Sequence, residues 1–384
     1  MEWIEEFLKE RKERSLLREL KVISYKENGF IYFNNKKFYD FSSNDYLGLA
    51  GHPKLKEIAK ETIEKYGTST SSSRLLNGTY KLHNLLEEKI ASFKAKEASI
   101  VFNSGYQANL GIISALAKKG DVIFIDRLSH ASIVDGVLLS GARFFRFNHN
   151  DLNHLKDLLD KNRNNFKNAF IITETIFSMD GDRAPLKEIV KLKEKYNCIL
   201  MVDEAHATGI FGKTGSGVVE EENLTDNVEL IMGTFSKALG GFGAYLACSL
   251  NIKKYLINTA RSFIYSTSLP PQDIAINIKS IDLIKEEPYR RERLLENSRF
   301  FIEKLIEKNF ITKSSSQIVP LIYNSASKTL EVAEKLKDLG YWVFAIRPPT
   351  VRENECRVRF SLSFYHSKEL LEKLVEDLAG IERI

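Results

Sequence analysis

Reactive side chains follow four of the apolar runs that the sequence predicts as strands. The four segments are residues 103–106, 174–178, 203–206 and 234–237, and His130 follows a fifth run by five residues. Ligands of open α/β sheets bind at the carboxyl ends of the strands, so these groups are expected to converge. Such a convergence is what a cofactor pocket needs.

Asp203 ends the apolar run 198–202, so its carboxylate is expected to be poorly solvated. A buried carboxylate takes up a proton unless a cation faces it. A pyridinium nitrogen is such a cation, and the pair would keep that ring protonated and electron-withdrawing. His206, one helical turn on, would reach the phenolic oxygen of the same ring. The spacing is equally compatible with Asp203 as a helix cap and His206 as a structural residue.

Lys237 lies in the segment Gly-Thr-Phe-Ser-Lys-Ala-Leu-Gly-Gly, just past the run 229–233. An ε-amine held among small residues beside a cationic conjugated ring loses solvation and becomes a nucleophile and base. Thr234 could donate to a phosphate group. A solvated lysine is the ordinary state of a loop position, and the surrounding glycines and Asp203 argue against it here.

A phosphate-binding turn is expected at Ser104-Gly105-Tyr106, before the expected helix 108–117. Backbone N–H groups at a helix N-terminus bind anions, although many strand-to-helix turns contain Ser-Gly. His130 would stack its imidazole on the pyridine face. A solvated loop histidine fits the same sequence.

A helicase-like pattern also occurs. Residues 203–206 spell Asp-Glu-Ala-His, and residues 207–214 fit a relaxed phosphate-loop pattern. A nucleotide-binding loop must precede the acidic strand and open a helix. Here it directly follows the acidic residues and leads into Gly-Ser-Gly, so we exclude a nucleotide-driven helicase.

The composition indicates a globular protein with room for two domains. Of 384 residues, 43% are hydrophobic and 28% charged, and the net charge is only +5. Without a dense Lys/Arg block, nucleic acid is not implied. Three unpaired cysteines argue against a disulfide framework and against a zinc site. Neither a secretory signal nor a membrane-length apolar run is present, so a cytoplasmic, non-membrane location is expected.

Alternating helices and strands place the reactive residues in an α/β domain. Residues 1–46 form an N-terminal arm, with a helical stripe over 3–20 and a hairpin turned at Asn34-Asn35. Residues 47–281 form a large domain with a mostly parallel sheet, and residues 282–384 a smaller α+β domain. The expected strands are 98–102, 121–125, 169–173, 198–202, 229–233, 243–247, 318–323, 343–346 and 357–362, and the expected helices include 85–93, 108–117, 152–159 and 186–196.

Long motifs make the chain resemble the α-oxoamine synthases, which are pyridoxal 5'-phosphate (PLP) enzymes. These motifs are SSNDYLGLA (42–50), SHAS (129–132), TETIFSMDGDRAP (173–185), residues 201–209 and 234–241, and YSTSLP (265–270). The resemblance implies the PLP-dependent transferase fold of aspartate aminotransferase (fold type I), with a mostly parallel central sheet and a smaller C-terminal domain.

The segment AIRPPTV (345–351) resembles the biotin-pathway members of this family. It implies decarboxylative condensation of L-alanine with a pimeloyl thioester, carried by coenzyme A or by an acyl carrier protein. A sister synthase that uses glycine or serine is the alternative.

The resemblance also implies roles for individual residues. Lys237 would carry PLP as a Schiff base and move the α-proton, Asp203 would pair with the pyridine nitrogen, and His130 would position the acyl donor. The other expected cofactor ligands are Gly105, Tyr106 and Thr234 at the phosphate, Ser178 and His206 at the phenolic oxygen, and Ser266 and Thr267 from the second subunit of a homodimer. The expected substrate ligands are Asn44 and Arg347 at the amino-acid carboxylate, Glu174 as a pocket acid, and Arg18 and Thr350 at the acyl chain.

Overall fold

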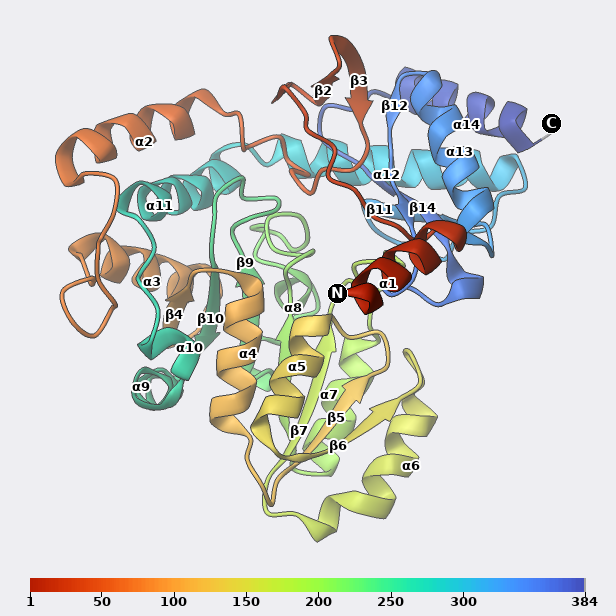
Figure 1. The fold of residues 1–384 in the computed structure, drawn as a ribbon. Helices are drawn as coiled ribbons and strands as arrows, with labels where there is room; N and C mark the ends of the chain where they lie inside the picture. The colour runs from red at the N-terminus through yellow and green to blue at the C-terminus, as the bar shows by residue number, and fades with distance from the viewer. Residues whose placement is uncertain (383–384) are drawn as a thin grey trace. The chain divides into compact units, whose positions relative to one another are not determined.

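The computed structural model describes residues 1–382 (Figure 1). The chain forms two compact units. Unit 1 joins Met1–Gly48 and Ser178–Asp182 to the described part of Glu292–Ile384. Unit 2 contains Leu49–Phe177 and Arg183–Arg291. The division into residues 1–46, 47–281 and 282–384 stays a prediction.

Unit 2 is built on a seven-stranded sheet with the order β4-β10-β9-β8-β7-β5-β6. Only β10 runs antiparallel to its neighbours within this sheet. Most strands are buried along their whole length, as expected for a sheet covered on both faces, and the mostly parallel α/β sheet is confirmed. The strands are β4 (Ala98–Phe102), β5 (Val122–Asp126), β6 (Arg143–Phe147), β7 (Ala169–Glu174), β8 (Ile199–Asp203), β9 (Leu230–Thr234) and β10 (Ala244–Cys248).

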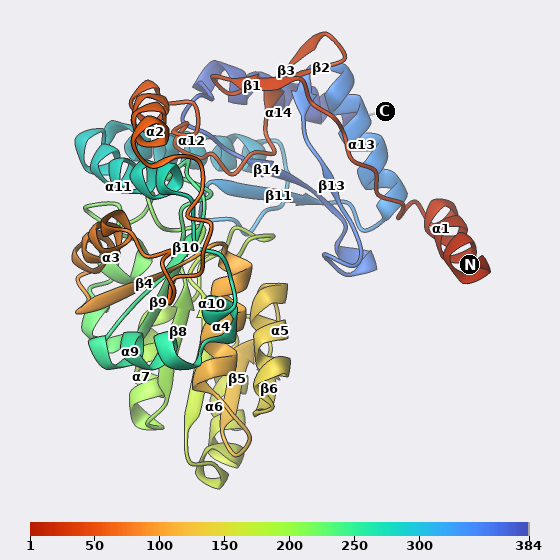
Figure 2. The ribbon, with the colours of Figure 1, turned by 60° about the vertical axis from the view of Figure 1, so that its left-hand side comes forward.

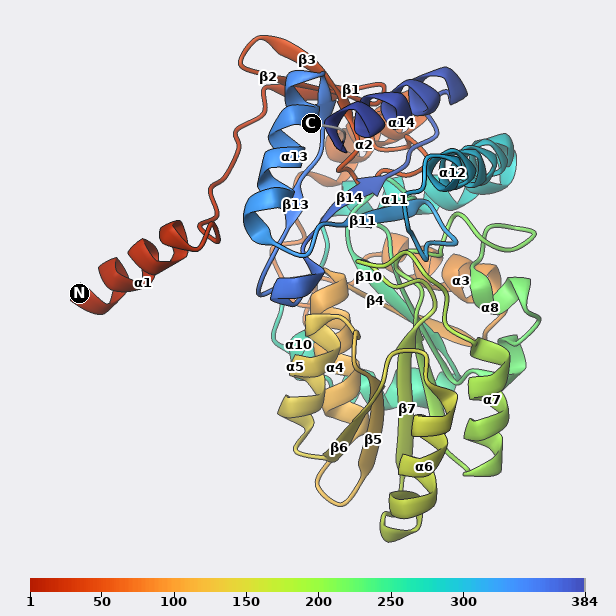
Figure 3. The same cartoon turned by 90° about the vertical axis from the view of Figure 1, so that its right-hand side faces the viewer.

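Helices cover both faces of this sheet. Figure 3 shows α4 and α5 on one face and α6 and α7 on the other. The helices of unit 2 are α2 (Pro53–Tyr66), α3 (Lys81–Phe93), α4 (Gly105–Leu116), α5 (Ala131–Ser140), α6 (Leu152–Asn162), α7 (Leu186–Lys195), α8 (Val218–Glu221), α9 (Leu250–Thr259), α10 (Arg261–Ile264) and α11 (Pro271–Glu286), with short 3-10 turns at Arg163–Asn165 and Thr225–Asn227.

Several elements of unit 2 were not predicted by range, among them α5 and β6. Gly136 lies inside α5, where glycine normally weakens a helix. A Cβ at this position would lie 3.0 Å from the backbone oxygen of Asn109, so the glycine permits α5 to pack closely on α4. β6 is the edge strand of the sheet and carries two exposed arginines, Arg143 and Arg146. Its sequence lacks the continuous apolar run by which the other strands were predicted.

Unit 1 contains two small sheets, with the orders β1-β2-β3-β12 and β11-β14-β13. The hairpin is confirmed, because Asn34 and Asn35 both take positive φ, as a tight two-residue turn requires. The strands are β1 (Tyr25–Glu27), β2 (Phe30–Phe33), β3 (Lys36–Asp40), β11 (Ile318–Ile322), β12 (Tyr341–Trp342), β13 (Ala345–Ile346) and β14 (Arg357–Ser361), and the helices are α1 (Glu2–Glu13), α12 (Tyr289–Glu307), α13 (Ala326–Asp338) and α14 (Lys368–Glu382), with a 3-10 turn at Glu353–Glu355.

Two predictions for unit 1 are wrong in part. Of the strand expected at 343–346, only β13 (Ala345–Ile346) forms, and it pairs with β14. The preceding strand β12 (Tyr341–Trp342) pairs with β3 in the other sheet. The helix expected over 3–20 ends at Glu13, where Ser15 turns to a φ of 57°. Every residue of α1 is at least partly exposed, and α1 stands apart from the other elements of its unit (Figure 2).

Among residues 1–382, no helix combines the length and the apolar character that crossing a membrane would require.

Candidate active site

One pocket of unit 2 collects the reactive groups from the strand ends. It has a cavity volume of about 180 Å³. Its lining includes eight of the predicted residues, namely Gly105, Tyr106, His130, Glu174, Asp203, His206, Thr234 and Lys237, and also Asn109, Ser132, Ala205, Met232 and Ser236. The side chains come from the carboxyl ends of β7, β8 and β9, from the segments that follow β5, β8 and β9, and from the N-terminal parts of α4 and α5, so the sheet topology accounts for their convergence.

Asp203 is the last residue of β8 and is 6% exposed. One carboxylate oxygen accepts the backbone N–H of Ala205 at 2.8 Å, and the other accepts Asn109 Nδ2 at 2.9 Å. Among residues 1–382, Asp203 has no ion-pair partner. A carboxylate removed from water in this way suits a cationic ligand.

Glu204 turns away from the pocket and anchors the turn that carries Asp203 and His206. Its carboxylate accepts Lys94 Nζ at 2.7 Å and the backbone N–H of Val219 at 3.0 Å. The side chains of Lys94 and Glu204 are 1% and 0% exposed. Such a buried pair holds its segment firmly, since removing one partner leaves an uncompensated charge.

Lys237 follows β9 on a loop that is folded back on itself. Its Nζ lies 2.8 Å from Nε2 of His206. The N–H of Gly240 donates to the backbone oxygen of Lys237 at 2.9 Å. Gly240 has a φ of 66°, and a Cβ there would lie 2.4 Å from the backbone nitrogen of Ala50. Only glycine suits both requirements, so this position fixes the course of the loop.

The turn Ser104-Gly105-Tyr106, predicted to bind phosphate, lies at the start of α4. Ser104 is the N-cap, and its Oγ accepts the N–H of Gln107 at 3.2 Å. A Cβ on Gly105 would lie 2.8 Å from Cγ2 of Thr234, so glycine keeps the turn open beside the end of β9. Within residues 1–382, the buried Oγ1 of Thr234 has no hydrogen-bond partner. An unsatisfied hydroxyl beside a helix N-terminus fits an anionic ligand.

His130 and Glu174 lie beside Asp203. The N–H of His130 donates to Glu174 Oε1 at 2.7 Å. Burial lowers the pKa of the His130 imidazole, and the Lys237 ammonium lowers it further against the opposing effect of Asp203. Burial raises the pKa of Glu174 to about 8, and the Asp203 carboxylate adds to this rise. At neutral pH the pocket therefore holds a neutral imidazole and a protonated Glu174 next to Asp203.

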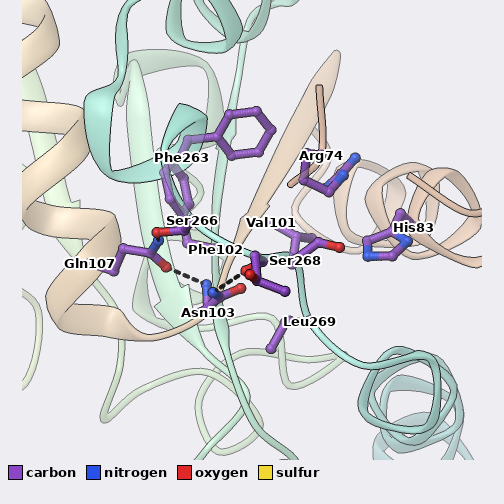
Figure 4. A pocket seen from close by; sticks show the side chains of 11 residues that line it. Arg74, His83, Val101, Phe102, Asn103, Gln107, Phe263, Ser266, Ser268 and Leu269 are labelled. Carbon is purple, nitrogen blue, oxygen red and sulfur yellow. Dashed lines mark hydrogen bonds between the residues drawn. The ribbon is translucent and has the colours of Figure 1, made fainter. Parts of the chain in front are cut away.

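Ser266 and Thr267 lie at a second, smaller cavity, of about 10 Å³, and are tied to the residues beside the phosphate-binding turn. Gln107 Nε2 donates to Ser266 Oγ at 2.8 Å, and Asn103 Nδ2 donates to the backbone oxygen of Thr267 at 2.7 Å (Figure 4). Within its own chain, Thr267 is thus connected to the residue before the turn, and Ser266 to the first turn of α4.

The remaining predicted residues belong to unit 1. Arg18 Nη2 donates to Thr350 Oγ1 at 2.9 Å, so the two residues expected at the acyl chain are in contact. They line a groove of about 670 Å³ together with Leu17, Leu330, Phe344 and Arg347. Arg347 Nη1 donates to the backbone oxygen of Ser15.

Arg359 is the guanidinium that contacts Asn44, and sequence reasoning missed it. Its Nη2 lies 3.4 Å from Asn44 Oδ1, and its Nε donates to the backbone oxygen of Ser178 at 2.6 Å. Arg359 is 9% exposed, and among residues 1–382 it has no carboxylate partner. The sequence feature that could have identified it is a second arginine within the apolar run 357–362. A buried charge without an opposite charge is unfavourable unless a ligand supplies one.

The helicase-like loop is closed to nucleotides. The carboxylate of Glu220 accepts the N–H groups of Thr214 and Ser216, at 3.2 and 3.1 Å, and the hydroxyl of Thr214 at 2.8 Å. These are the donors that a phosphate group would need.

Comparison with known proteins identifies the family of the chain. The family model for aminotransferase class I and II matches residues 36–378. The chain belongs to this family. The 8-amino-7-oxononanoate synthase of Geobacter sulfurreducens is 46% identical over 97% of this chain and 96% of its own length. A putative enzyme of the same name from Bacillus cereus is 46% identical over 94% of this chain and 91% of its own length.

Two solved structures share the fold. Serine palmitoyltransferase from S. paucimobilis, with a bound PLP–myriocin aldimine, superposes with a TM-score of 0.93 at 30% identity, covering 99% of this chain and 97% of that one. The 8-amino-7-oxononanoate synthase of Francisella tularensis superposes with a TM-score of 0.79 at 31% identity, covering 90% and 98%. The resemblance to the α-oxoamine synthases is thus confirmed, and the chain is a PLP-dependent acyltransferase of fold type I.

The residues present fit PLP. The buried carboxylate of Asp203 lacks an ion-pair partner within residues 1–382, the hydroxyl of Thr234 is unsatisfied there, and the amine of Lys237 lines the same pocket. A pyridinium nitrogen, a phosphate and an aldehyde are the three groups that these side chains would take.

Proposed function

We propose that the chain condenses L-alanine with a pimeloyl thioester, releasing 8-amino-7-oxononanoate, CO2 and the free thiol, in biotin biosynthesis. The observation that carries the proposal is the 46% identity to an 8-amino-7-oxononanoate synthase across nearly the whole of both chains. The acyl group would be carried by coenzyme A or by an acyl carrier protein. The second candidate is a sister synthase using serine or glycine, which the likeness to serine palmitoyltransferase favours.

Bound PLP supplies an electron sink for the charge that is left on the amino-acid α-carbon when its proton is removed. Lys237 would hold the cofactor covalently, and its Nζ would accept and return that proton. Its position 2.8 Å from His206 Nε2 gives the proton a neighbouring acceptor. Asp203 would face the pyridine nitrogen as an anion and keep it protonated.

We propose further contacts with the cofactor. Thr234 Oγ1 and the N–H groups of Gly105 and Tyr106 would bind the phosphate. His206 would bind the phenolic oxygen, and we retain Ser178 as a proposed partner of the same oxygen. Glu174, when protonated, would present a carboxyl hydrogen to the substrate without adding a second negative charge beside Asp203.

His130 would donate a hydrogen bond to the acyl carbonyl. Its Nδ1 accepts the N–H of Ser132 at 3.2 Å, which assigns the single proton of the neutral ring to Nε2. A neutral donor polarises a carbonyl without repelling the Lys237 ammonium.

Substrate carboxylates would bind to the arginines of unit 1. Arg359 is buried without a carboxylate partner among residues 1–382, and it contacts Asn44, so we propose this pair at the carboxylate of alanine. Arg347 remains the other proposal for that role. Arg18 and Thr350 would bind the acyl substrate, whose chain the apolar side chains of the adjoining groove would accommodate.

We propose a homodimer in which Ser266 and Thr267 complete the phosphate site of the second subunit. Large apolar side chains exposed on unit 2 are the residues that we propose to lie in the interface between copies of the chain. They are Leu76, Leu138, Leu139, Phe242 and Tyr265.

A substrate panel tests the proposed function. Purified enzyme loaded with PLP is assayed with alanine, serine and glycine against pimeloyl, acetyl and palmitoyl thioesters of coenzyme A and of an acyl carrier protein. Alanine with a pimeloyl thioester is expected to give the highest kcat/KM. A preference for serine with palmitoyl, or for glycine with acetyl, would instead support the sister synthases.

The two arginines can be separated by substitution. Arg359→Met is expected to raise the KM for alanine by about 10- to 100-fold, because a charge-assisted hydrogen bond to the carboxylate is lost. Arg347→Met is the matched control and should leave the KM for alanine within about threefold. Steady-state kinetics with alanine as the varied substrate measure both values. The reverse pattern would assign the alanine carboxylate to Arg347.

A further inference from the structure

A chain of hydrogen bonds links the two sides of the cofactor pocket through Asn109. The Nδ2 atom of Asn109 donates to Asp203 Oδ2 at 2.9 Å and to Ser132 Oγ at 3.0 Å. Ser132 Oγ in turn lies 2.8 Å from Nδ1 of His130. The four residues come from β8, from α4, from the first turn of α5 and from its N-cap.

The direction of each hydrogen bond follows from chemistry. Both hydrogens of the Asn109 amide nitrogen are used, one toward Asp203 and one toward Ser132. Ser132 Oγ therefore accepts from Asn109, and its own hydrogen is free to donate to His130 Nδ1. The backbone N–H of Ser132 also points at Nδ1, at 3.2 Å. Nδ1 is thus the acceptor of this chain, and Nε2 carries the proton.

Burial of the polar Asn109 side chain is unfavourable, and packing alone does not explain it. It is 1% exposed and lies in α4 between Ala108 and Leu110. Within residues 1–382, its Oδ1 has no hydrogen-bond partner. An unsatisfied buried amide oxygen is unfavourable, so an apolar residue would suit this helix position better if only packing mattered.

The helices that carry the chain are closely packed. A Cβ on Gly136 of α5 would lie 3.0 Å from the backbone oxygen of Asn109, which leaves little room for α5 to shift on α4. The link through Ser132 is therefore short and rigid, and it fixes His130 relative to Asp203.

We propose that Asn109 is a positioning residue, which sets the Asp203 carboxylate and the His130 imidazole in register across the cofactor pocket. The inference rests on the proposed function, in which these two groups face the pyridine nitrogen and the acyl carbonyl. Asn109 itself holds both groups in place and takes no part in the proton transfer, which is assigned to Lys237.

The test compares Asn109→Ala with Asn277→Ala in the PLP-loaded, full-length protein. Asn277 is a matched control, because it is fully buried in α11, its Nδ2 donates one hydrogen bond, to the Phe242 oxygen at 2.8 Å, and its Oδ1 also lacks a partner within residues 1–382. Asn109→Ala is expected to reduce kcat roughly 10- to 100-fold with little change in the KM for alanine. Asn277→Ala should change stability without that loss.

A spectroscopic readout separates positioning from general destabilisation. Without the Asn109 donor, more negative charge remains on Asp203, so the pH midpoint of the visible absorption band and the NMR titration midpoint of His130 should both move upward, by roughly half a pH unit. Asp203, Glu174 and Lys237 are the titratable groups around His130, and the Tyr106 ring lies edge-on to it. Each of these groups is unchanged in the variant.

Ser132→Ala gives a second test if Asn109→Ala does not fold. It interrupts the chain toward His130 and leaves the bond from Asn109 to Asp203 in place, so the His130 midpoint should move while the absorption midpoint stays. The proposal is overturned if neither variant moves the His130 midpoint, or if Asn109→Ala and Asn277→Ala reduce kcat equally. These midpoints do not depend on which substrates are turned over, so an error in the proposed reaction would leave this test intact.

Discussion

Lys237→Ala is expected to remove the visible absorption band of the purified protein and to lower turnover by more than about 10³-fold. The substitution deletes the amine that would hold PLP covalently and accept the α-proton from the substrate. In the wild-type protein, sodium borohydride should bleach the band, because it reduces the bond between amine and cofactor. Absorption spectra before and after reduction, together with an activity assay, measure both effects.

Lys213→Ala is the control for this experiment. Lys213 is an exposed lysine of unit 2, in the helicase-like loop, and its substitution should leave colour and turnover unchanged. A Lys237→Ala protein that keeps its band and its sensitivity to borohydride would show that another lysine carries the cofactor.

Asp203→Asn is expected to retain PLP but to reduce turnover by about 10³-fold. A neutral amide cannot keep the pyridine nitrogen protonated, so the ring would lose most of its capacity to withdraw electrons. The covalent bond to Lys237 and the phosphate contacts remain, and the protein should therefore stay coloured. Cofactor content is measured by releasing PLP in alkali, and turnover with the preferred substrates from the panel.

Asp121→Asn provides a closely matched comparison. Asp121 is also buried, at 2% exposed, and its oxygens accept one backbone N–H, from Lys118 at 3.1 Å, and one asparagine amide, from Asn168 at 2.8 Å. This variant should lose a similar hydrogen-bonding arrangement but keep its activity. Similar losses of turnover in both variants would point to folding and away from a role of Asp203 at the pyridine nitrogen.

Much of the cofactor pocket could be predicted from sequence because the sheet imposes a simple rule. Buried parallel strands are marked by continuous apolar runs, and the residues just after them share one edge of the sheet. Asp203, Thr234 and Lys237 were found in this way. The hydrogen bonds that orient them were not visible, since Asn109 appears in the sequence only as one polar residue inside an apolar helix.

The residues of unit 1 were harder to predict. Arg359 contacts Asn44 and Ser178, which lie far from it along the chain, and no local spacing connects the three. Arg347 was predicted at the amino-acid carboxylate because it lies in a long and distinctive motif, whereas Arg359 does not. Helix α5 was missed because Gly136 weakens the helical pattern, although the same glycine permits close packing on α4.

The ion pair of Lys94 and Glu204 limits how this part of the protein can diverge. Loss of either charge alone would leave the other stranded in the interior, at about 3–5 kcal/mol, which is a large share of the stability of a typical domain. During evolution, two apolar residues could replace this ion pair only if both positions changed nearly together. The two positions should therefore vary jointly or hardly at all, even though Lys94 lies outside the cofactor pocket.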